Sequence, residues 1–162
     1  MEDSQAAGKW KTEQGGEYFA AGTGGAITGR GADLLIIDDP HKEQDLKKDG
    51  KSFEKAWDWY LSGPRQRLQP GGKIVVVMTR WSTKDITGQL LKAQMADDAD
   101  QWKIIKFPAI MPSGKACWPQ FWKLKELQKT QATLTPSRWN AQYMQEPTSD
   151  EGALIKREWW QD

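Results

Sequence analysis

Two adjacent acidic residues follow a strongly apolar segment early in the chain. Residues 34–40 read Leu-Leu-Ile-Ile-Asp-Asp-Pro, so Asp38 and Asp39 stand where a buried strand would end. Ligands of open α/β sheets bind beyond the carboxyl ends of the strands. A carboxylate at that edge can bind Mg²⁺, which prefers oxygen ligands and keeps several waters. We assign Asp38 to the metal, and Asp39 to orienting an attacking water or accepting its proton.

The acidic pair also has a simpler interpretation. Asp-Asp-Pro is a favourable turn sequence, so both acids could do no more than end the strand and begin a turn. The motif alone does not decide between the two. His41, the only histidine, follows the pair, and we interpret it as a surface loop residue rather than a proton carrier.

A second apolar segment ends in polar residues that could reach the same edge of the sheet. Residues 75–81 read Val-Val-Val-Met-Thr-Arg-Trp. Thr79 could bond a water or a phosphate oxygen, and Arg80 could bind phosphate. The alternative is a turn that leads into a helix and carries an exposed arginine.

A glycine-rich segment, residues 22–33, precedes the acidic strand. A phosphate-binding Walker A loop needs the pattern G-x-x-x-x-G-K-[ST] between a strand and a helix, and this pattern occurs nowhere in the chain. We therefore predict a hairpin that places Arg30 near the site.

The elements that must position these residues alternate along the chain. Apolar periodicity and turn residues predict strands over 17–21, 33–38, 73–79 and 103–107, and helices over 51–62, from Thr83 as N-cap to Leu91, over 121–131 and from Pro136 to Met144. This order predicts an α/β fold with a mostly parallel sheet, in which the two long apolar strands are buried on both faces.

Size and composition fit one globular domain. The chain has 162 residues, a net charge of +1 and a single cysteine, which excludes an internal disulfide. Nucleic-acid modules usually carry a strong basic excess, so any DNA contact is expected to be local or shared between subunits. The ten tryptophans are interpreted as apolar anchors rather than base-stacking platforms, because their clusters lack regularly interleaved basic residues.

Five blocks of the sequence, in this order, resemble the large terminase subunit of tailed bacteriophages. The blocks are GTGGAITGRGADLLIIDDPHK, VVVMTRWSTKDITGQLL, FPAIMPSGKACWPQFW, RWNAQYMQEP and GALIKREWW, and the resemblance runs from about Trp10 to Trp160. Each block alone is modestly specific, whereas the five in this order are highly specific.

The resemblance implies a P-loop ATPase domain of the additional-strand type, followed by an RNase H-like nuclease. This chain would hold the second half of the ATPase domain over residues 1–147, with the Walker A part missing. Residues 148–162 would form a short helical linker toward the nuclease.

The resemblance also implies a role for each candidate residue. Asp38 matches the Walker B aspartate that binds the metal. Asp39 matches the catalytic carboxylate, which is Glu in many members of the family. Arg30 matches an arginine before the Walker B strand and is assigned to catalysis. Thr79 and Arg80 match the coupling motif after the next strand and are assigned to nucleotide binding.

The implied activity is Mg²⁺-dependent ATP hydrolysis that drives viral DNA into procapsids. The implied partners are double-stranded viral DNA, the portal protein, the small terminase subunit and further copies of the full-length chain in a ring. The expected location is the bacterial host cytoplasm, at the procapsid during assembly, with no secretion and no membrane. The chain alone is expected to be inactive, since it lacks the phosphate cradle, and poorly soluble, because its strands leave an open apolar edge.

Two alternatives remain open at this stage. The chain could belong to another P-loop motor, such as a helicase, that uses the same strand-end aspartates. It could also be a non-catalytic interaction domain or a prophage remnant. The flanking reading frames distinguish these: a portal gene nearby favours a terminase, and a downstream acidic nuclease pattern argues against a remnant.

Overall fold

The computed structural model describes residues 8–23, 25, 27, 29–47 and 51–148. The architecture is mixed α/β with two separate two-stranded sheets, one antiparallel and one parallel. In chain order the elements are β1 (Lys9–Lys11), β2 (Glu17–Phe19), β3 (Ala32–Asp38), the 3₁₀ helix η1 (Glu43–Lys47), α1 (Lys51–Ser62), the 3₁₀ helix η2 (Pro64–Arg67), β4 (Leu68–Val77), α2 (Ile86–Ala93), α3 (Leu124–Thr133), α4 (Pro136–Arg138) and the π-helix η3 (Trp139–Tyr143).

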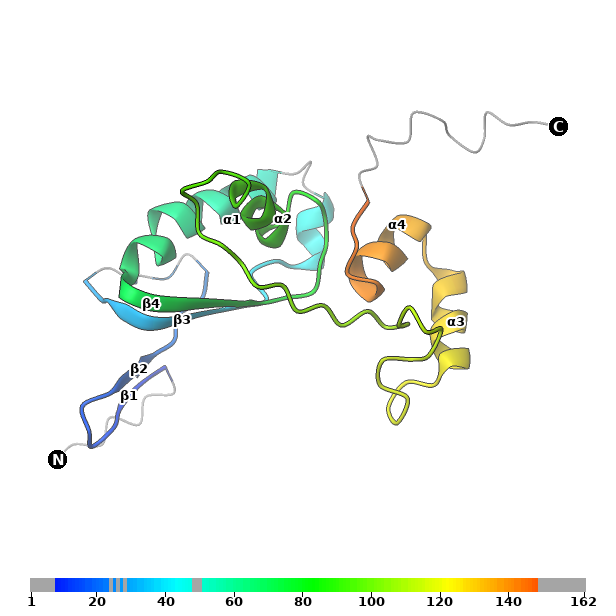
Figure 1. Cartoon of the computed structure of the whole chain (residues 1–162), viewed down its shortest axis with the longest axis horizontal. Coiled ribbons are helices and arrows are strands. Elements are labelled where there is room, and N and C mark those ends of the chain that lie inside the picture. Colours follow the sequence, from blue (N-terminus) through cyan, green and yellow to red (C-terminus); the bar gives the residue numbers. More distant parts are fainter. Residues whose placement is uncertain (1–7, 24, 26, 28, 48–50, 149–162) are drawn as a thin grey trace.

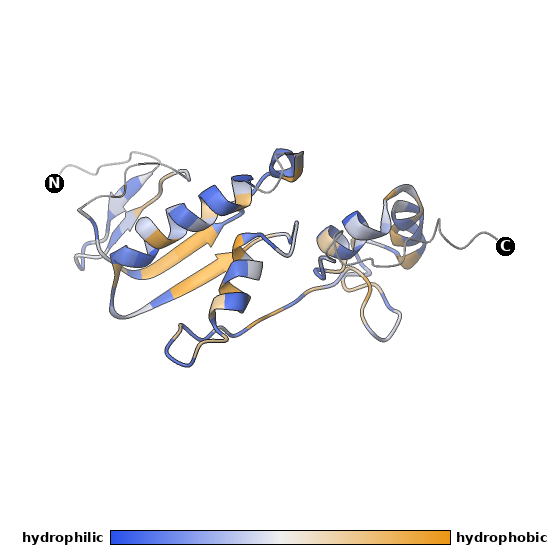
Figure 2. Cartoon of the chain, turned by 90° about the horizontal axis from the view of Figure 1, so that it is seen from above, coloured by the Kyte–Doolittle hydropathy of each residue, from blue (hydrophilic) through white to orange (hydrophobic). Residues whose placement is uncertain are grey.

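The two long apolar segments form the parallel sheet, and α1 connects them. In the register Ile36 lies beside Val75, and Asp38 beside Val77. Parallel neighbours need a crossover connection, which a helix usually provides. Figure 1 shows α1 and α2 on the same side of the β3–β4 sheet, and Figure 2 shows that both strands are strongly hydrophobic. The predicted α/β class and the parallel pairing are therefore confirmed.

Only one face of this sheet is covered. Side chains alternate along a strand, and those on the covered face pack into a core whose buried members are Ile37, Tyr60, Ile86 and Leu90. On the opposite face Leu34, Ile36, Val75 and Val77 are 56%, 59%, 43% and 53% exposed. The prediction that both strands are buried on both faces is therefore wrong for the described structure. Their continuous apolar sequence leaves an apolar surface instead.

The predicted helices are present, with changes at their ends. The first spans Lys51–Ser62 as predicted. The second begins at Ile86 and is capped by Asp85, whose side chain accepts a hydrogen bond from the Gly88 N–H. The prediction of Thr83 as N-cap is wrong, since the carboxylate two residues later accepts from a free amide of the first turn. Within the described residues, no helix is both long and apolar enough to cross a membrane.

Two predicted strands have a different outcome. Of the strand predicted over 17–21, Glu17–Phe19 form β2, which pairs with β1 in an antiparallel hairpin. Residues 103–107 are not a strand, and the apolar side chains of Ile104, Ile105 and Phe107 are exposed. Within the described residues this segment pairs with neither β3 nor β4, so the parallel sheet has two strands.

The C-terminal elements form a second, smaller core. Ala116, Leu127 and Trp139 are buried together, beneath partly buried side chains that include Tyr143 and Met144. Figure 1 shows α3 and α4 beside the parallel sheet, with an extended segment leading from one group of elements to the other. Of the predicted linker, residues 149–162 lie outside the described residues.

Candidate functional site

The acidic pair lies where β3 ends and the chain turns. Asp38 is the last residue of the strand, beside Val77, and both Asp38 and Asp39 are exposed. Asp39 has a φ of 40°, a left-handed conformation that Asp adopts more readily than most residues. Its N–H still donates to the Val77 carbonyl, at 2.9 Å. Strand and turn together therefore present two carboxylates at the carboxyl edge of the parallel sheet.

The end of β4 contacts this turn directly. The backbone N–H of Thr79 donates to Oδ1 of Asp39, at 3.3 Å. The side chain of Asp38, by contrast, makes no hydrogen bond or ion pair with the described residues, although its backbone lies in the ladder with β4. The structure thus brings Asp38, Asp39 and Thr79 together, because the parallel register places the ends of both strands at one edge.

Arg80 faces away from the acidic pair. Its Nε lies 3.2 Å and 3.0 Å from the two carboxylate oxygens of Asp85, and its backbone N–H donates to the Gln145 side chain at 3.1 Å. The side chain is only 14% exposed. A contact between Arg80 and phosphate would require this ion pair to open, so the arrangement supports a positioning role rather than the predicted nucleotide contact.

Asp85 organises the loop between β4 and α2. Its fully buried carboxylate accepts hydrogen bonds from the backbone N–H groups of Trp81, Ser82 and Gly88, in addition to the Arg80 side chain. A side chain at Gly88 would collide with the Thr83 carbonyl, because a Cβ there would lie 2.0 Å from that oxygen. Asp85 was not predicted to be a central residue from the sequence, although Asp is among the strongest N-cap residues.

His41 is buried, which corrects the prediction of a surface loop residue. Its Nε2 accepts a hydrogen bond from the Ile86 N–H at 2.9 Å, while its Nδ1 lies 3.8 Å from Asp45. Burial lowers the pKa of His41, and the carboxylates of Asp85 and Asp45 oppose that effect. The imidazole ring also meets Phe53 edge to face. Through this hydrogen bond, the neutral imidazole connects the acidic turn to the first residue of α2.

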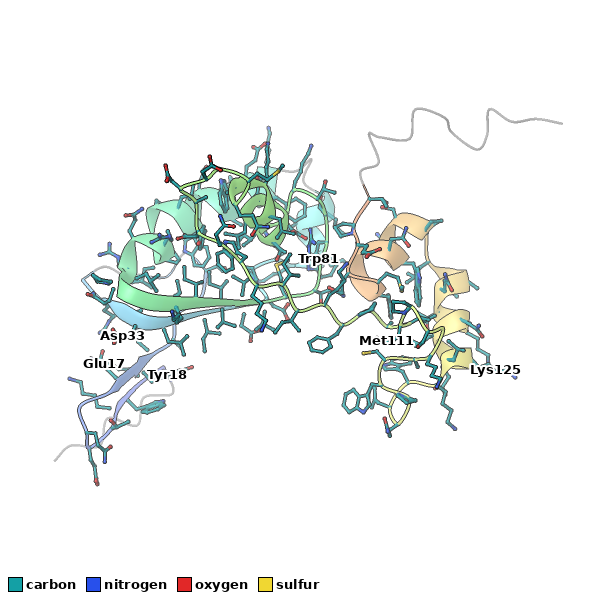
Figure 3. The ribbon with its side chains drawn as sticks, in the orientation of Figure 1. Glu17, Tyr18, Asp33, Trp81, Met111 and Lys125 are labelled. Atoms are coloured by element: carbon teal, nitrogen blue, oxygen red, sulfur yellow. The ribbon has the colours of Figure 1, made fainter. Side chains whose placement is uncertain are left out.

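Arg30 lies at the opposite end of β3 from the acidic pair. Its guanidinium pairs with Glu17 and covers the ring of Phe19, 4.3 Å from the ring centroid. At about 3.3 Å per residue the seven-residue strand separates Arg30 from Asp38 by roughly 20 Å. Figure 3 shows Glu17 and Asp33 at this far end. The prediction that a hairpin places Arg30 near the site is therefore wrong, since β2 holds the arginine where the strand begins.

The donor set fits a magnesium ion that keeps most of its own water. Among the described residues no three His, Cys, Asp or Glu side chains gather into a metal-binding group. Mg²⁺ is commonly held by one or two carboxylates together with waters and substrate phosphates. Asp38, exposed and without a partner in the described part of the chain, has the chemistry of such a ligand.

Comparison with known proteins adds no assignment. No protein-family model matches the sequence, and no curated protein matches it.

Proposed function

We propose that this chain supplies the Walker B half of the nucleotide site in the large terminase ATPase of a tailed bacteriophage. The observation that carries the proposal is the edge where Asp38 and Asp39 end β3 and the Thr79 N–H bonds to Asp39. This is the carboxyl edge of a parallel pair, where α/β folds bind their ligands. The five sequence blocks favour a terminase over other P-loop motors.

The two carboxylates have different surroundings and therefore different roles in this proposal. Asp38 is the metal ligand, and the magnesium ion offsets phosphate charge when the nucleotide is bound. Asp39 is the orienting carboxylate for the attacking water. The Thr79 N–H holds one of its oxygens, so the other oxygen can accept a hydrogen bond from the water.

The surrounding hydrogen bonds provide a route from the site to α2. Thr79 contacts Asp39 and is followed by Arg80, whose ion pair with Asp85 lies at the start of that helix. His41 makes a second connection, from the acidic turn to Ile86. A change in Asp39 on loss of the γ-phosphate would therefore move α2, the kind of element shift that couples hydrolysis to motion.

The proposed site needs a phosphate-binding loop with its lysine, which this sequence does not contain. In the proposed motor a nuclease, the small subunit, the portal and double-stranded DNA would act with it. We therefore propose that the 162-residue chain alone binds ATP weakly and does not hydrolyse it. ATP turnover by the purified chain that disappears in an Asp38→Ala variant would contradict this.

A paramagnetic metal tests the site in the chain as it is. Mn²⁺ binds the same hard oxygen ligands as Mg²⁺ and broadens the NMR signals of nearby amides. We expect broadening first at Asp38, Asp39 and Thr79, and its loss in the Asp38→Asn, Asp39→Asn double variant. Asp33→Asn is the matched control, because Asp33 is an exposed carboxylate at the far end of the same strand. Broadening that centres elsewhere, or survives the double variant, would remove the chemical basis of the proposal.

The flanking DNA tests the assignment to a terminase. We expect an upstream reading frame with a P-loop, a downstream acidic nuclease pattern and a portal gene nearby. ATP hydrolysis by the protein joined to that upstream segment should depend on Asp38 and Asp39 and be unaffected by Asp33→Asn. A P-loop followed by helicase motifs would favour the other motor class instead.

A further inference from the structure

Three exposed aromatic side chains lie together in the loop before α3. Trp118, Phe121 and Trp122 are 62%, 64% and 40% exposed. The rings of Trp118 and Phe121 stack with their centroids 5.0 Å apart, and Phe121 meets Trp122 edge to face at 5.8 Å. Large aromatic side chains usually bury most of their area. This cluster, here named the aromatic platform, keeps broad ring faces in solvent.

Backbone hydrogen bonds hold the aromatic platform in place. The Trp118 carbonyl accepts from the N–H groups of both Phe121 and Trp122, at 3.1 Å and 2.8 Å. One residue later, the N–H of Lys123, the N-cap of α3, donates to the Glu126 side chain at 3.1 Å. The rings therefore project from a tight turn next to a helix, and little ordering is needed before they can bind a partner.

The charge around the aromatic platform is positive. From Gln101 to Lys125 the chain has five lysines, Lys103, Lys106, Lys115, Lys123 and Lys125, and the carboxylate nearest to the platform in the sequence is that of Glu126, at the start of α3. Lys106 is paired with Glu146, whereas Lys115, Lys123 and Lys125 are exposed, and Figure 3 shows Lys125 extending away from α3. In a chain whose net charge is only +1, this is a local cationic region.

We propose that the aromatic platform and its three exposed lysines bind single-stranded nucleic acid. Unpaired bases stack on exposed aromatic rings without regard to sequence, and lysines beside the rings neutralise the backbone phosphates. A duplex keeps its base faces covered, so the platform selects unpaired strands. This proposal departs from the interpretation of these tryptophans as anchors only, which rested on the lack of regularly interleaved basic residues, because the rings are exposed and lysines lie beside them. The proposal is independent of the nucleotide site.

A second exposed aromatic pair provides the matched control. Trp10 stacks on Tyr18 with the ring centroids 5.1 Å apart, and both residues are exposed. The neighbouring Lys11 and Arg30, however, are both paired with Glu17. Glu17 thus neutralises two of the cations beside this stacking surface and leaves Lys9, so we expect the surface to contribute less than the aromatic platform.

The test is fluorescence anisotropy of a labelled oligothymidine of about 12 nucleotides, a length within the usual range for one binding module. Trp118→Ala and Trp122→Ala should each weaken binding about 5- to 100-fold, as expected for one lost stacking contact, while Trp118→Phe should largely preserve it. Trp10→Ala should change the affinity less than about twofold. Lys123→Gln should reduce the steepness of the salt dependence by about 0.7 in log–log slope.

Several outcomes would overturn the proposal. The first is that the oligothymidine does not bind, and the second is that a duplex of the same length binds with equal affinity. The third is that Trp10→Ala weakens binding as much as Trp118→Ala does. Thermal unfolding of each variant shows whether it is folded, and the Trp118→Phe variant separates stacking from folding if the alanine variants unfold. Concentration-dependent self-association that Trp118→Ala abolishes, without oligonucleotide binding, would identify the platform as a protein interface instead.

Discussion

The Nε2 atom of His41 accepts a hydrogen bond from the backbone N–H of Ile86, at 2.9 Å. His41 follows the acidic turn, and Ile86 is the first residue of α2. Two segments more than forty residues apart in sequence are thereby joined beside the candidate site. The neutral imidazole has one ring nitrogen that accepts a hydrogen bond, whereas both nitrogens of the protonated ring are donors. This contact therefore requires His41 to be neutral.

Acid should weaken the fold through His41. Burial lowers the pKa of this imidazole from its ordinary value of 6.5, so below that pH the unfolded chain binds a proton more readily than the folded chain. The contribution is therefore fully present above about pH 6.5 and is lost as the pH falls toward and through the folded pKa. Urea unfolding between about pH 7.5 and 5.5 measures this loss, above the range where most carboxylates titrate.

A glutamine variant is the control for that titration. His41→Gln keeps a possible acceptor for the Ile86 N–H but does not titrate, so its free energy of unfolding should change less across the same pH range. His41→Ala should cost about 1–3 kcal/mol at neutral pH, since it leaves a buried amide without an acceptor. If the free energy of unfolding had the same pH dependence in the wild type and in His41→Gln, His41 would not be the group whose protonation weakens the fold.

Replacing Asp85 should destabilise the loop that follows β4. Asp85→Ala leaves Arg80 largely buried without its partner and removes the acceptor of three backbone amides. Breaking a buried ion pair from one side typically costs about 3–5 kcal/mol. Urea unfolding followed by circular dichroism measures the change.

Two further variants show whether the Asp85 effect is specific. Asp97→Ala, at an exposed carboxylate, should change the free energy of unfolding by less than about 0.5 kcal/mol. Arg80→Ala combined with Asp85→Ala should cost less than the sum of the single changes, since contacting partners are not additive. Strict additivity would show that the ion pair contributes nothing.

The hydroxyl of Tyr60 is a buried polar group that has no hydrogen-bond partner among the described residues. Tyr60→Phe should therefore be neutral, or stabilise the fold by up to about 1 kcal/mol, whereas Tyr60→Ala should cost about 3–5 kcal/mol through the lost core packing. Thermal unfolding of both variants measures this. A clear loss in Tyr60→Phe would mean that the hydroxyl has a partner.

The same residue should also make the fold sensitive to alkali. Burial, with a smaller effect of Asp100, raises the pKa of Tyr60 to about 12 from 10.0. The unfolded chain loses this proton first, so stability is intact below pH 10 and declines as the pH rises through that interval. Tyr60→Phe should show a shallower decline, measured by urea unfolding at several alkaline pH values.

The uncovered face of the parallel sheet should cause self-association. Ile36 and Val75 lie side by side on that face, and exposed apolar strands with free edges favour aggregation. Ile36→Thr combined with Val75→Thr should lower the weight-average mass in light scattering without reducing thermal stability. Ile37→Thr, on the covered face one residue away, should instead destabilise the fold. Equal self-association of wild type and the double threonine variant would contradict this.

The local sequence was sufficient to predict the main elements around the site. The apolar runs before Asp38 and Thr79 predicted β3 and the second half of β4, which begins earlier, at Leu68, and ends at Val77. Apolar spacing predicted α1 over its observed range. Their order predicted a parallel pair, which brings Asp38, Asp39 and Thr79 to one edge. These features follow from side-chain periodicity and backbone pairing, and both can be inferred from neighbouring residues.

Tertiary packing alone decided the partners of the polar side chains. Arg30 pairs with Glu17 because β2 lies at the start of β3, and Arg80 turns toward Asp85 because that carboxylate caps α2. The burial of His41 likewise depends on α1 and α2. A charged or aromatic side chain can reach several neighbours several ångströms away. Which of them it meets depends on how distant segments pack, and sequence spacing does not contain that information.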